Sequence, residues 1–400
     1  MTIPEILREK VLIALESLEV EVPDPARVQV TKAADLRFGD FQSNIAMMLA
    51  KGLGKNPREF AEDLSGRIAA EELCEISIAG PGFLNFTLKA EAWADLARAQ
   101  WESDDLSVSE VKLPQTIVVD FSAPNVAKPM HVGHIRSTII GECLSRVATK
   151  IGHKVIKDNH IGDWGTQFGM VTWAWKKGVD EERLETEPLQ ELLRLYRTAS
   201  DASKDDEETK EECRAELVKL QQGDPENKAI WERCLALSRK GLNQIYDRLD
   251  VSFDHWMGES AYNDALAPLV EQLVADDLAR ESDGAICIFS NGAGKPKHDP
   301  FKINRDGEWQ DFPMMIRKSD GAFNYATTDI ATVQHRVKEW NADHIWYVVD
   351  FRQGGHFSQL FDTSSRLGHE EVNLVHVAFG TILGKDGKPL KTRAGDLPQL

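Results

Sequence analysis

Residues 116–159 read TIVVDFSAPNVAKPMHVGHIRSTIIGECLSRVATKIGHKVIKDN. The stretch begins with a short, almost continuous apolar run at 116–121, which is typical of a strand buried on both faces of a parallel sheet. A loop with two prolines follows, then helical spacing over 131–151 and a second strand candidate at 154–159. This strand, helix and strand order predicts a parallel α/β sheet with ligand-binding loops at the carboxyl ends of its strands.

The same pattern returns further along the chain. A probable strand, GAICIFS at 284–290, is followed by a lysine-bearing turn, and the strands HIWYVVDF (344–351) and VNLVHVAF (372–379) flank a helical pattern at about 355–367. We expect the strands at 344–351 and 372–379 and the helix between them to complete the second half of the sheet. Residues 180–282 are charged and helical in pattern, so we expect a helical insertion there. Its most acidic run, DASKDDEETKEEC, is interpreted as a solvated helix face or a flexible loop.

A smaller unit precedes the sheet. Helical spacing is visible at 3–19, 41–53 and 57–70, and ISIAGPGFLNFTL at 76–88 alternates around a Gly-Pro-Gly turn as a strand does. The polar stretch WESDDLSVSEVKLP then separates the two patterns. We therefore expect an α+β domain at 1–112 and an α/β domain at 113–400.

Composition excludes several classes of protein. The chain has 400 residues, with 47 Lys plus Arg against 65 Asp plus Glu and a net charge of -18, so a generic nucleic-acid coat is disfavoured, although basic side chains can still gather at one site. The 5 cysteines form no C-x-x-C pair, which fits reduced thiols in a cytosol. No signal peptide and no apolar run of about 20 residues is apparent. A cytoplasmic protein without a membrane partner is expected.

The junction between the first strand and the following helix carries the densest chemistry. His131 and His134 lie three residues apart and Lys128 precedes them, so all three can face an anion at the positive end of a helix. Gly133 lets a flat group approach the backbone, because any Cβ there would stand in the way. Two alternatives stay open for the histidines: half of a metal site, although no third ligand is apparent nearby, and simple core packing.

The segment VVDFSAPNVAKPMHVGHIRSTIIGECLSR resembles the signature region of class I aminoacyl-tRNA synthetases, and in particular the arginyl-tRNA synthetase family. The resemblance continues through NHIGDWGTQFG, SDGAFNYATTDIA, YVVDFRQGGHFSQLF and GTILGKDGKPLKTRAGD, and the first hundred residues are similar to the N-terminal domain of that family through FGDFQSNIAM and IAGPGFLNF. The resemblance implies a Rossmann-like parallel-sheet catalytic domain with helical insertions, preceded by a small α+β domain that contacts tRNA. It spans nearly the whole chain.

The resemblance also implies roles at the phosphate end of a site. His131 and His134 would hold ATP and stabilise its α-phosphate, and Gly133 would pack against adenine. The second signature loop of the family matches Lys388-Pro-Leu-Lys-Thr-Arg393, where Thr392 stands in place of the second signature lysine. Some arginyl enzymes with this departure carry a lysine three residues before the first histidine, as Lys128 is here. Lys128 is therefore assigned to the phosphates, with Lys391 and Arg393 as loop charges that bind ATP.

An arginine substrate needs carboxylate and amide acceptors in a fixed arrangement around its planar guanidinium. Tyr325 and Asp329 are four residues apart, so they share one face of a predicted helix, although such a pair is often only a surface pair. By resemblance they bind arginine, as do Gln353, Asn125 and Asp120, with Asn125 at the α-amino or carboxyl end. The loop NHIGDWGTQFG adds Trp164 and Gln167 as pocket-lining candidates without assigned roles.

The function implied by the resemblance is an arginine-tRNA ligase that uses ATP, with Mg²⁺ accompanying ATP and no metal bound by the protein itself. Its partners would be arginine, ATP and tRNA, and a monomer is expected. One alternative is another nucleotidyl-transferring enzyme with the same histidines, and a second is a catalytically impaired tRNA-binding fragment. The family continues beyond the KPLKTRAGD loop into a helical anticodon-binding domain, so the chain is interpreted as lacking that domain.

Overall fold

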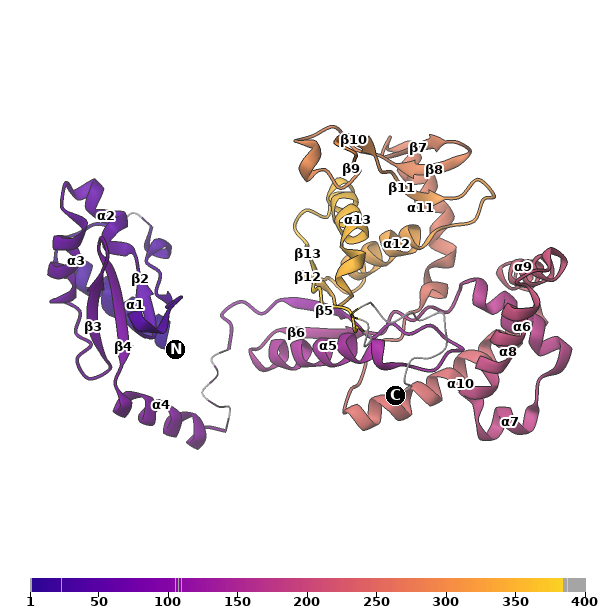
Figure 1. The fold of residues 1–400 in the computed structure, drawn as a ribbon, viewed down its shortest axis with the longest axis horizontal. Coiled ribbons are helices and arrows are strands. Elements are labelled where there is room, and N and C mark those ends of the chain that lie inside the picture. Colours follow the sequence, from indigo (N-terminus) through magenta and orange to yellow (C-terminus); the bar gives the residue numbers. More distant parts are fainter. Residues whose placement is uncertain are drawn as a thin grey trace. The chain divides into compact units, whose positions relative to one another are not determined.

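The strand, helix and strand predicted at 116–159 are present in the computed structural model as β5 (Thr116–Asp120), α5 (Val132–Lys150) and β6 (Lys154–Asp158). Strand β5 pairs in parallel with β6 and with β12 (His344–Tyr347), and β12 pairs in parallel with β13 (Asn373–His376). The sheet order is therefore β13-β12-β5-β6 (Figure 1). Since all three pairings are parallel, the predicted α/β class is confirmed.

The structure describes residues 2–22, 24–104, 106, 108, 110–383 and 387. The chain divides into two compact units, Met1–Val111 and Lys112–Leu400.

The first unit is built on an antiparallel sheet with the order β1-β2-β4-β3. Its strands and helices are α1 (Ile3–Ser17), β1 (Thr31–Lys32), β2 (Phe41–Ser43), α2 (Ile45–Leu53), α3 (Pro57–Ser65), β3 (Cys74–Ala79), β4 (Phe83–Leu88) and α4 (Ala90–Glu102). The helix expected at 41–53 was wrong in its first turn, because residues 41–43 pair with β4 instead. The segment around Gly-Pro-Gly is a hairpin of two strands, β3 and β4, and both glycines have positive φ. Leu7, Val11 and Leu15 of α1 pack on Leu84 and Phe86 of β4.

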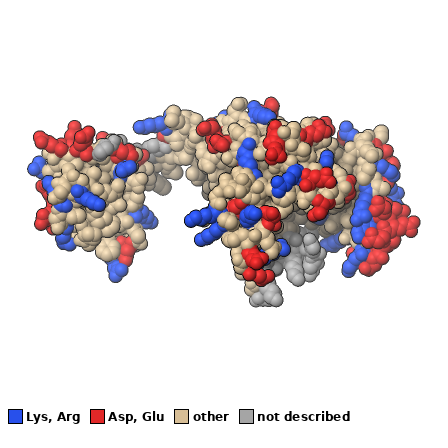
Figure 2. Space-filling view, turned by 90° about the horizontal axis from the view of Figure 1, so that it is seen from above, with Lys and Arg blue, Asp and Glu red and all other residues tan. Residues whose placement is uncertain are grey.

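The second unit contains the predicted helical insertion. The range 180–282 holds α7 (Glu181–Thr186), α8 (Pro188–Ala202), α9 (Glu207–Gln221), α10 (Pro225–Leu249) and α11 (Asn263–Ala275), and ends with a strand at 279–282; α6 (Thr166–Gly178) precedes it. Much of the acidic run forms α9, whose Glu207 pairs with Lys210 and whose Glu211 pairs with Arg214, all on exposed side chains. Acidic and basic side chains accordingly crowd together at the right-hand end of Figure 2, where the insertion lies. The interpretation as a solvated helix face is confirmed for this helix.

A small antiparallel sheet and two helices follow. The sheet has the order β11-β8-β7 and consists of β7 (Ala279–Ser282), β8 (Ala285–Ile288) and β11 (Met314–Arg317), with the hairpin β9 (Lys302–Arg305) and β10 (Glu308–Asp311) inserted before β11. Helices α12 (Tyr325–Lys338) and α13 (Gly354–Arg366) then flank β12 in sequence. Short 3₁₀ turns occur at Pro25–Arg27, Leu36–Phe38, Glu259–Tyr262 (η3), Pro296–His298 and Phe351–Gln353 (η5).

Strand β5 is covered on both faces, which explains its continuous apolar sequence. Val118 faces a core that contains Ile330 of α12 and Leu360 of α13. Ile117 and Val119 face the opposite core, which contains Leu242 and Tyr246 of α10. The parallel sheet is thus held between α12 and α13 on one side and α5 and α10 on the other. Within the part of the chain that the structure describes, we find no helix with the length and apolarity to cross a membrane.

Candidate functional site

The histidine signature lies where β5 has ended and α5 begins. His131 is the N-cap of α5, and its Nδ1 accepts a hydrogen bond from the backbone N–H of Gly133 at 3.1 Å. The Nδ1 of His134 accepts from the backbone N–H of His131 at 3.1 Å. The two rings stack with their centroids 4.0 Å apart. The two histidine rings therefore lie together at the first turn of α5.

This geometry fixes the chemical state of the two rings. Because each Nδ1 is an acceptor, the proton of each neutral imidazole lies on Nε2, which is left as the donor. Burial lowers the pKa of His131, and burial together with the neighbouring His131 ring lowers the pKa of His134 to about 4. At neutral pH the pair therefore offers two uncharged N–H donors, next to the partial positive charge of a helix N-terminus.

Two neighbours of the histidines make contacts that spacing alone does not predict. A Cβ on Gly133 would lie 2.8 Å from Cε1 of His131, so the histidine ring of the same turn needs a glycine here. Lys128 places its Nζ 4.1 Å from the ring centroid of Tyr196 on α8, in a cation–π contact. The side chain of Lys128 thus contacts the helical insertion from the loop between β5 and α5.

Asn125 is exposed in the loop between β5 and α5, and its backbone bridges to Gly162 in the loop after β6. A Cβ on Gly162 would lie 2.3 Å from Oδ1 of Asn125, so a larger residue here would displace the Asn125 side chain. Gln167 donates to the carbonyl of Gly162 at 2.7 Å, and Trp164 donates through Nε1 to Asn263 at 3.0 Å. Gln167 therefore bonds to the loop after β6, and Trp164 bonds that loop to the first residue of α11.

Three side chains from α12 and α13 form a second cluster. Oδ2 of Asp329 lies 2.6 Å from Nε2 of His356, and the exposed Tyr325 packs edge-on against the same imidazole at 4.9 Å. The predicted shared helix face of Tyr325 and Asp329 is confirmed by these contacts. Gln353 is the exposed residue that precedes α13, one turn before His356. His356 was not identified from the sequence, because nothing local indicates that it faces the earlier helix.

Glu259 extends this cluster and was also missed. Burial raises its pKa, and the carboxylates of Asp163 and Asp329 raise it further, while His160 opposes them. Asp163 accepts hydrogen bonds from the backbone N–H and the hydroxyl of Ser260, at 2.8 and 2.7 Å. Burial is the main cause of the raised pKa of Asp163. The three carboxylates thus share a negative region that a bound cation would stabilise.

Gly258 allows η3 to lie close to Asp163. A Cβ on Gly258 would lie 2.4 Å from the carboxyl carbon of Asp163, so only glycine fits where η3 approaches the loop after β6. The sequence signal for this feature is the triplet Gly258-Glu-Ser260 shortly after FDHW, in a range for which the sequence predicts helices.

Asp120 has a different environment from the one predicted. Its Oδ2 accepts a hydrogen bond from Nη2 of Arg336 at 2.7 Å, and Nη2 also donates to Oδ2 of Asp158 at 2.7 Å. Arg336 and Asp158 are both 0% exposed, and Asp120 is 6% exposed. Asp120 and Asp158 are register partners at the ends of β5 and β6. The internal guanidinium of α12 therefore already pairs with the carboxylate that was assigned to the substrate.

Two predicted site residues have no described position. Lys391 and Arg393, assigned to the phosphates, lie outside the described residues. Within the described ranges, no group of three or more His, Cys, Asp or Glu side chains is arranged to hold a metal ion.

Comparison with known proteins agrees with this geometry. Residues 101–400 match a family described as tRNA synthetases class I (R), catalytic domain, and residues 5–88 match the arginyl tRNA synthetase N terminal domain. An arginine--tRNA ligase of Rhodopirellula baltica is 38% identical over 99% of this chain and 69% of its own length. Another, of Thermosynechococcus vestitus, is 43% identical over 92% of this chain and 62% of its own length.

Solved structures give the same result for the fold. The crystal structure of arginyl-tRNA synthetase from Plasmodium falciparum superposes with a TM-score of 0.71 at 26% identity, covering 96% of this chain and 66% of that one. The arginyl-tRNA synthetase of Thermus thermophilus gives a TM-score of 0.69 at 20% identity, over 98% of this chain and 67% of that one. The chain thus spans about two thirds of the length of the proteins that it matches.

Proposed function

Because the chain belongs to the class I arginyl-tRNA synthetase family, we propose that it joins arginine to ATP and then transfers the arginyl group to tRNA. In the first step an oxygen of the arginine carboxylate attacks the α-phosphorus of ATP, the bond to the β-phosphate oxygen breaks, and pyrophosphate leaves. In the second step the terminal ribose hydroxyl of tRNA attacks the carbonyl of arginyl-adenylate, and AMP leaves.

The observation that carries this proposal is a site with two chemically opposite ends at the carboxyl edge of one sheet. At the end of β5, His131 and His134 offer two neutral Nε2–H donors at a helix N-terminus, which suits phosphate oxygens. Carboxylates of Asp163 in the loop after β6, Glu259 of η3 and Asp329 of α12 form the other end, which suits a guanidinium. The reaction needs both ends, because it joins a cationic amino acid to a triphosphate.

The histidine pair would act by positioning and charge stabilisation. Adenylate formation spreads negative charge over the oxygens of the α-phosphate in the transition state. Two donors that are already oriented by backbone N–H groups need no rearrangement when this charge develops. We expect Mg²⁺ to arrive with ATP, and Lys391 and Arg393 to approach its phosphates.

Glu259 and Asp329 would select the amino acid. A planar guanidinium can donate to both carboxylates at once, whereas a lysine ammonium cannot match two fixed acceptors equally well. Tyr325 would border the same pocket, and Asn125 and Gln353 would hold the arginine backbone. Asp120 would act indirectly, by fixing Arg336 behind the pocket. A substrate without the guanidinium would leave the half-buried carboxylates of Glu259 and Asp329 without this cationic partner, so a selectivity of about 10⁴ needs no editing step.

We also propose that the protein is a cytoplasmic monomer. All 5 cysteines are free, which fits a reducing compartment.

The experiment is amino-acid-dependent exchange of pyrophosphate into ATP, with and without arginine tRNA, followed by transfer to tRNA. Arginine should support exchange, while lysine and citrulline should not. Exchange with a different amino acid would indicate another nucleotidyl-transferring enzyme. Binding of tRNA without exchange or charging would indicate an RNA-binding protein without catalysis.

A further inference from the structure

The loop between β5 and α5 has an unusual backbone. Ser122, Ala123 and Ala127 have φ of 70°, 46° and 63°, in the left-handed region that L residues avoid. Seven other non-glycine residues of the described chain have positive φ, and five of these are Asp or Asn, which adopt it most readily. Ser and Ala have no such local advantage. The loop that carries Asn125 and leads to His131 must therefore be held in shape by other parts of the molecule.

Each of the three strained residues has its backbone N–H bound by a side chain from another segment. Ser122 donates to Oγ of Ser137 on α5 at 2.8 Å, and Ala123 donates to Oδ1 of Asn159 after β6 at 3.1 Å. Ala127 donates to Oγ of Ser238 on α10 at 3.1 Å. Ser238 is 1% exposed, so water cannot easily replace it as the acceptor.

A second residue of α10, Tyr246, contacts both Ser122 and Asn159. The hydroxyl of Tyr246 lies 2.7 Å from Oγ of Ser122 and accepts from Nδ2 of Asn159 at 3.1 Å. Oγ1 of Thr138 lies 2.9 Å from Oγ of Ser122 and 2.9 Å from the carbonyl oxygen of His134. Tyr246 is therefore connected through hydroxyl groups to the backbone of the second signature histidine.

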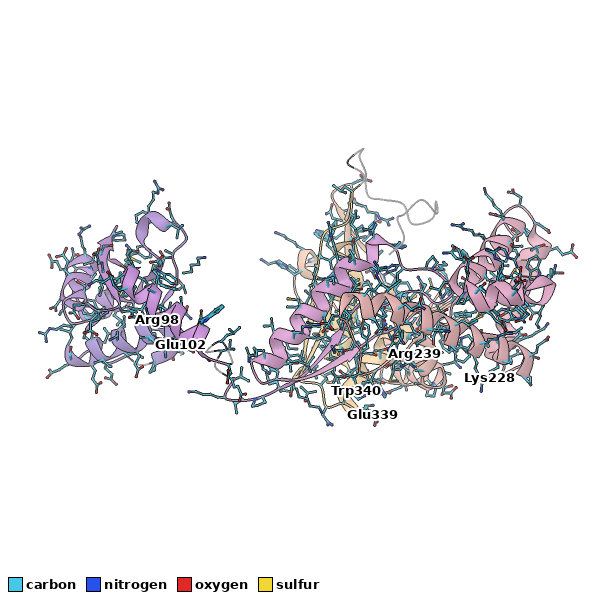
Figure 3. All side chains as sticks on the ribbon, turned by 90° about the horizontal axis from the view of Figure 1, so that it is seen from below. Arg98, Glu102, Lys228, Arg239, Glu339 and Trp340 are labelled. Carbon is cyan, nitrogen blue, oxygen red and sulfur yellow. The ribbon has the colours of Figure 1, made fainter. Side chains whose placement is uncertain are left out.

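Helix α10 is itself firmly placed. Ser238, Leu242 and Tyr246 are spaced by four residues, so one buried face of the helix meets the loop and the sheet. The Tyr246 ring also packs against Phe253 at 5.0 Å and Trp256 at 5.7 Å. Arg239, labelled in Figure 3, follows Ser238 and places its guanidinium 4.9 Å from the ring centroid of Trp256.

We propose that Ser238 and Tyr246 are positioning residues, through which α10 of the helical insertion holds the strained loop in its ligand-binding conformation. This inference rests on the proposed function for its consequence, because the loop carries the groups that would meet arginine and ATP. The helical insertion is then part of the catalytic machinery as a template. Its residues touch no substrate in this role.

Hydrogen–deuterium exchange tests the contact without any need for activity. Ser238→Ala and Tyr246→Phe should speed exchange of peptides covering 121–130 about tenfold, the effect expected from loss of a hydrogen bond to a buried group. Ser145→Ala is the matched control, because Ser145 is also a buried helical serine and its hydroxyl bonds only to the carbonyl of Gly141 in its own helix. Equal exchange of the loop in Ser238→Ala, Tyr246→Phe and Ser145→Ala would overturn the proposal.

A double variant tests whether strain is the cause. Glycine adopts positive φ without penalty. Ala127→Gly in the Ser238→Ala background should therefore restore the affinity for ATP that Ser238→Ala lowers. The readout is the Kd of ATP with Mg²⁺ by calorimetry: we expect it to rise about tenfold in Ser238→Ala and to return to within about twofold in the double variant. An unchanged Kd in Ser238→Ala, or no recovery in the double variant, would contradict a positioning role.

A second cycle tests the route through Ser122. If Tyr246 acts on the loop through that hydroxyl, Tyr246→Phe combined with Ser122→Ala should weaken ATP binding no more than the stronger single variant. If the losses of ATP affinity in the two single variants add up in the double variant, Tyr246 does not act through the Ser122 hydroxyl. If the parent chain binds no ATP, the proposed function fails, while the exchange measurement still decides whether α10 holds the loop.

Discussion

Oδ2 of Asp329 on α12 lies 2.6 Å from Nε2 of His356 in the first turn of α13. The contact leaves the second carboxylate oxygen of Asp329 for another donor. It also joins two helices that are separated in sequence by β12.

Asp329→Asn is predicted to raise the KM for arginine by about 10² while the KM for ATP changes by less than about twofold, because one charge-assisted acceptor is lost. Steady-state pyrophosphate exchange measures both constants. His356→Ala should have a smaller effect in the same direction, since it frees the orientation of Asp329 without removing its charge. A rise in the KM for ATP as large as that for arginine would place Asp329 elsewhere in the reaction.

The raised pKa of Glu259 leads us to predict that arginine binding depends on pH. Its pKa is raised by burial and by Asp163 and Asp329, so lowering the pH protonates Glu259 before ordinary exposed glutamates. Only the ionised form attracts a guanidinium, so the Kd of arginine should rise as the pH falls from about 7.5 to about 5. Glu259→Gln should bind arginine weakly throughout and lose most of this slope. Equal slopes in the parent and Glu259→Gln would exclude Glu259 as the titrating acceptor.

Arg336→Met is predicted to lower the free energy of unfolding by about 3–5 kcal/mol, because Asp120 and Asp158 would remain buried without their counterion. Urea unfolding measures the change. Adding Asp120→Asn and Asp158→Asn to that variant should restore part of the loss. Arg233→Met, which removes an exposed ion pair with Glu181, should cost less than about 1 kcal/mol. Similar losses in the two arginine variants would mean that the buried pairing contributes little.

Gly133→Ala is predicted to reduce kcat for adenylate formation by about 10², because the new Cβ would displace the His131 ring by a few tenths of an ångström or more. Gly178→Ala is the control, since a Cβ there meets no atom within 4 Å. Stopped-flow detection of adenylate formation distinguishes a slower chemical step from weaker binding. Unimpaired kcat in Gly133→Ala would show that the ring position is not critical.

The sheet could be predicted from the sequence because its signals are local. The apolar run and the helical spacing of 116–159 became β5, α5 and β6, and the strands expected at 344–351 and 372–379 became β12 and β13 of the same sheet, although each is shorter than predicted. The strand expected at 284–290 became β8, which lies in the small antiparallel sheet. Residues 348–350 follow β12 without continuing it as a strand. The end of a strand depends on its neighbours, which a sequence window does not contain.

The site could be predicted only in part, for a physical reason. The histidine pair and the Tyr325 and Asp329 pair each lie within one helical turn, so spacing alone brings them together. Ser260 and Asp163 are 97 residues apart and meet only after folding, with Glu259 next to Ser260 in the chain. Asp120 was assigned to the substrate by resemblance, and its ion pair with Arg336, 216 residues away, cannot be identified from spacing.

The most direct test of the account compares the parent chain with His134→Ala in arginine-dependent exchange of pyrophosphate into ATP, in the presence of arginine tRNA. His134 offers a neutral Nε2–H donor, because its pKa is lowered to about 4, so its loss should slow exchange by about 10²–10³ without changing the far-ultraviolet circular dichroism. Exchange in the parent that requires arginine and is lost in His134→Ala is the predicted result. Undiminished exchange in His134→Ala, or no arginine-dependent exchange in the parent, would contradict the account.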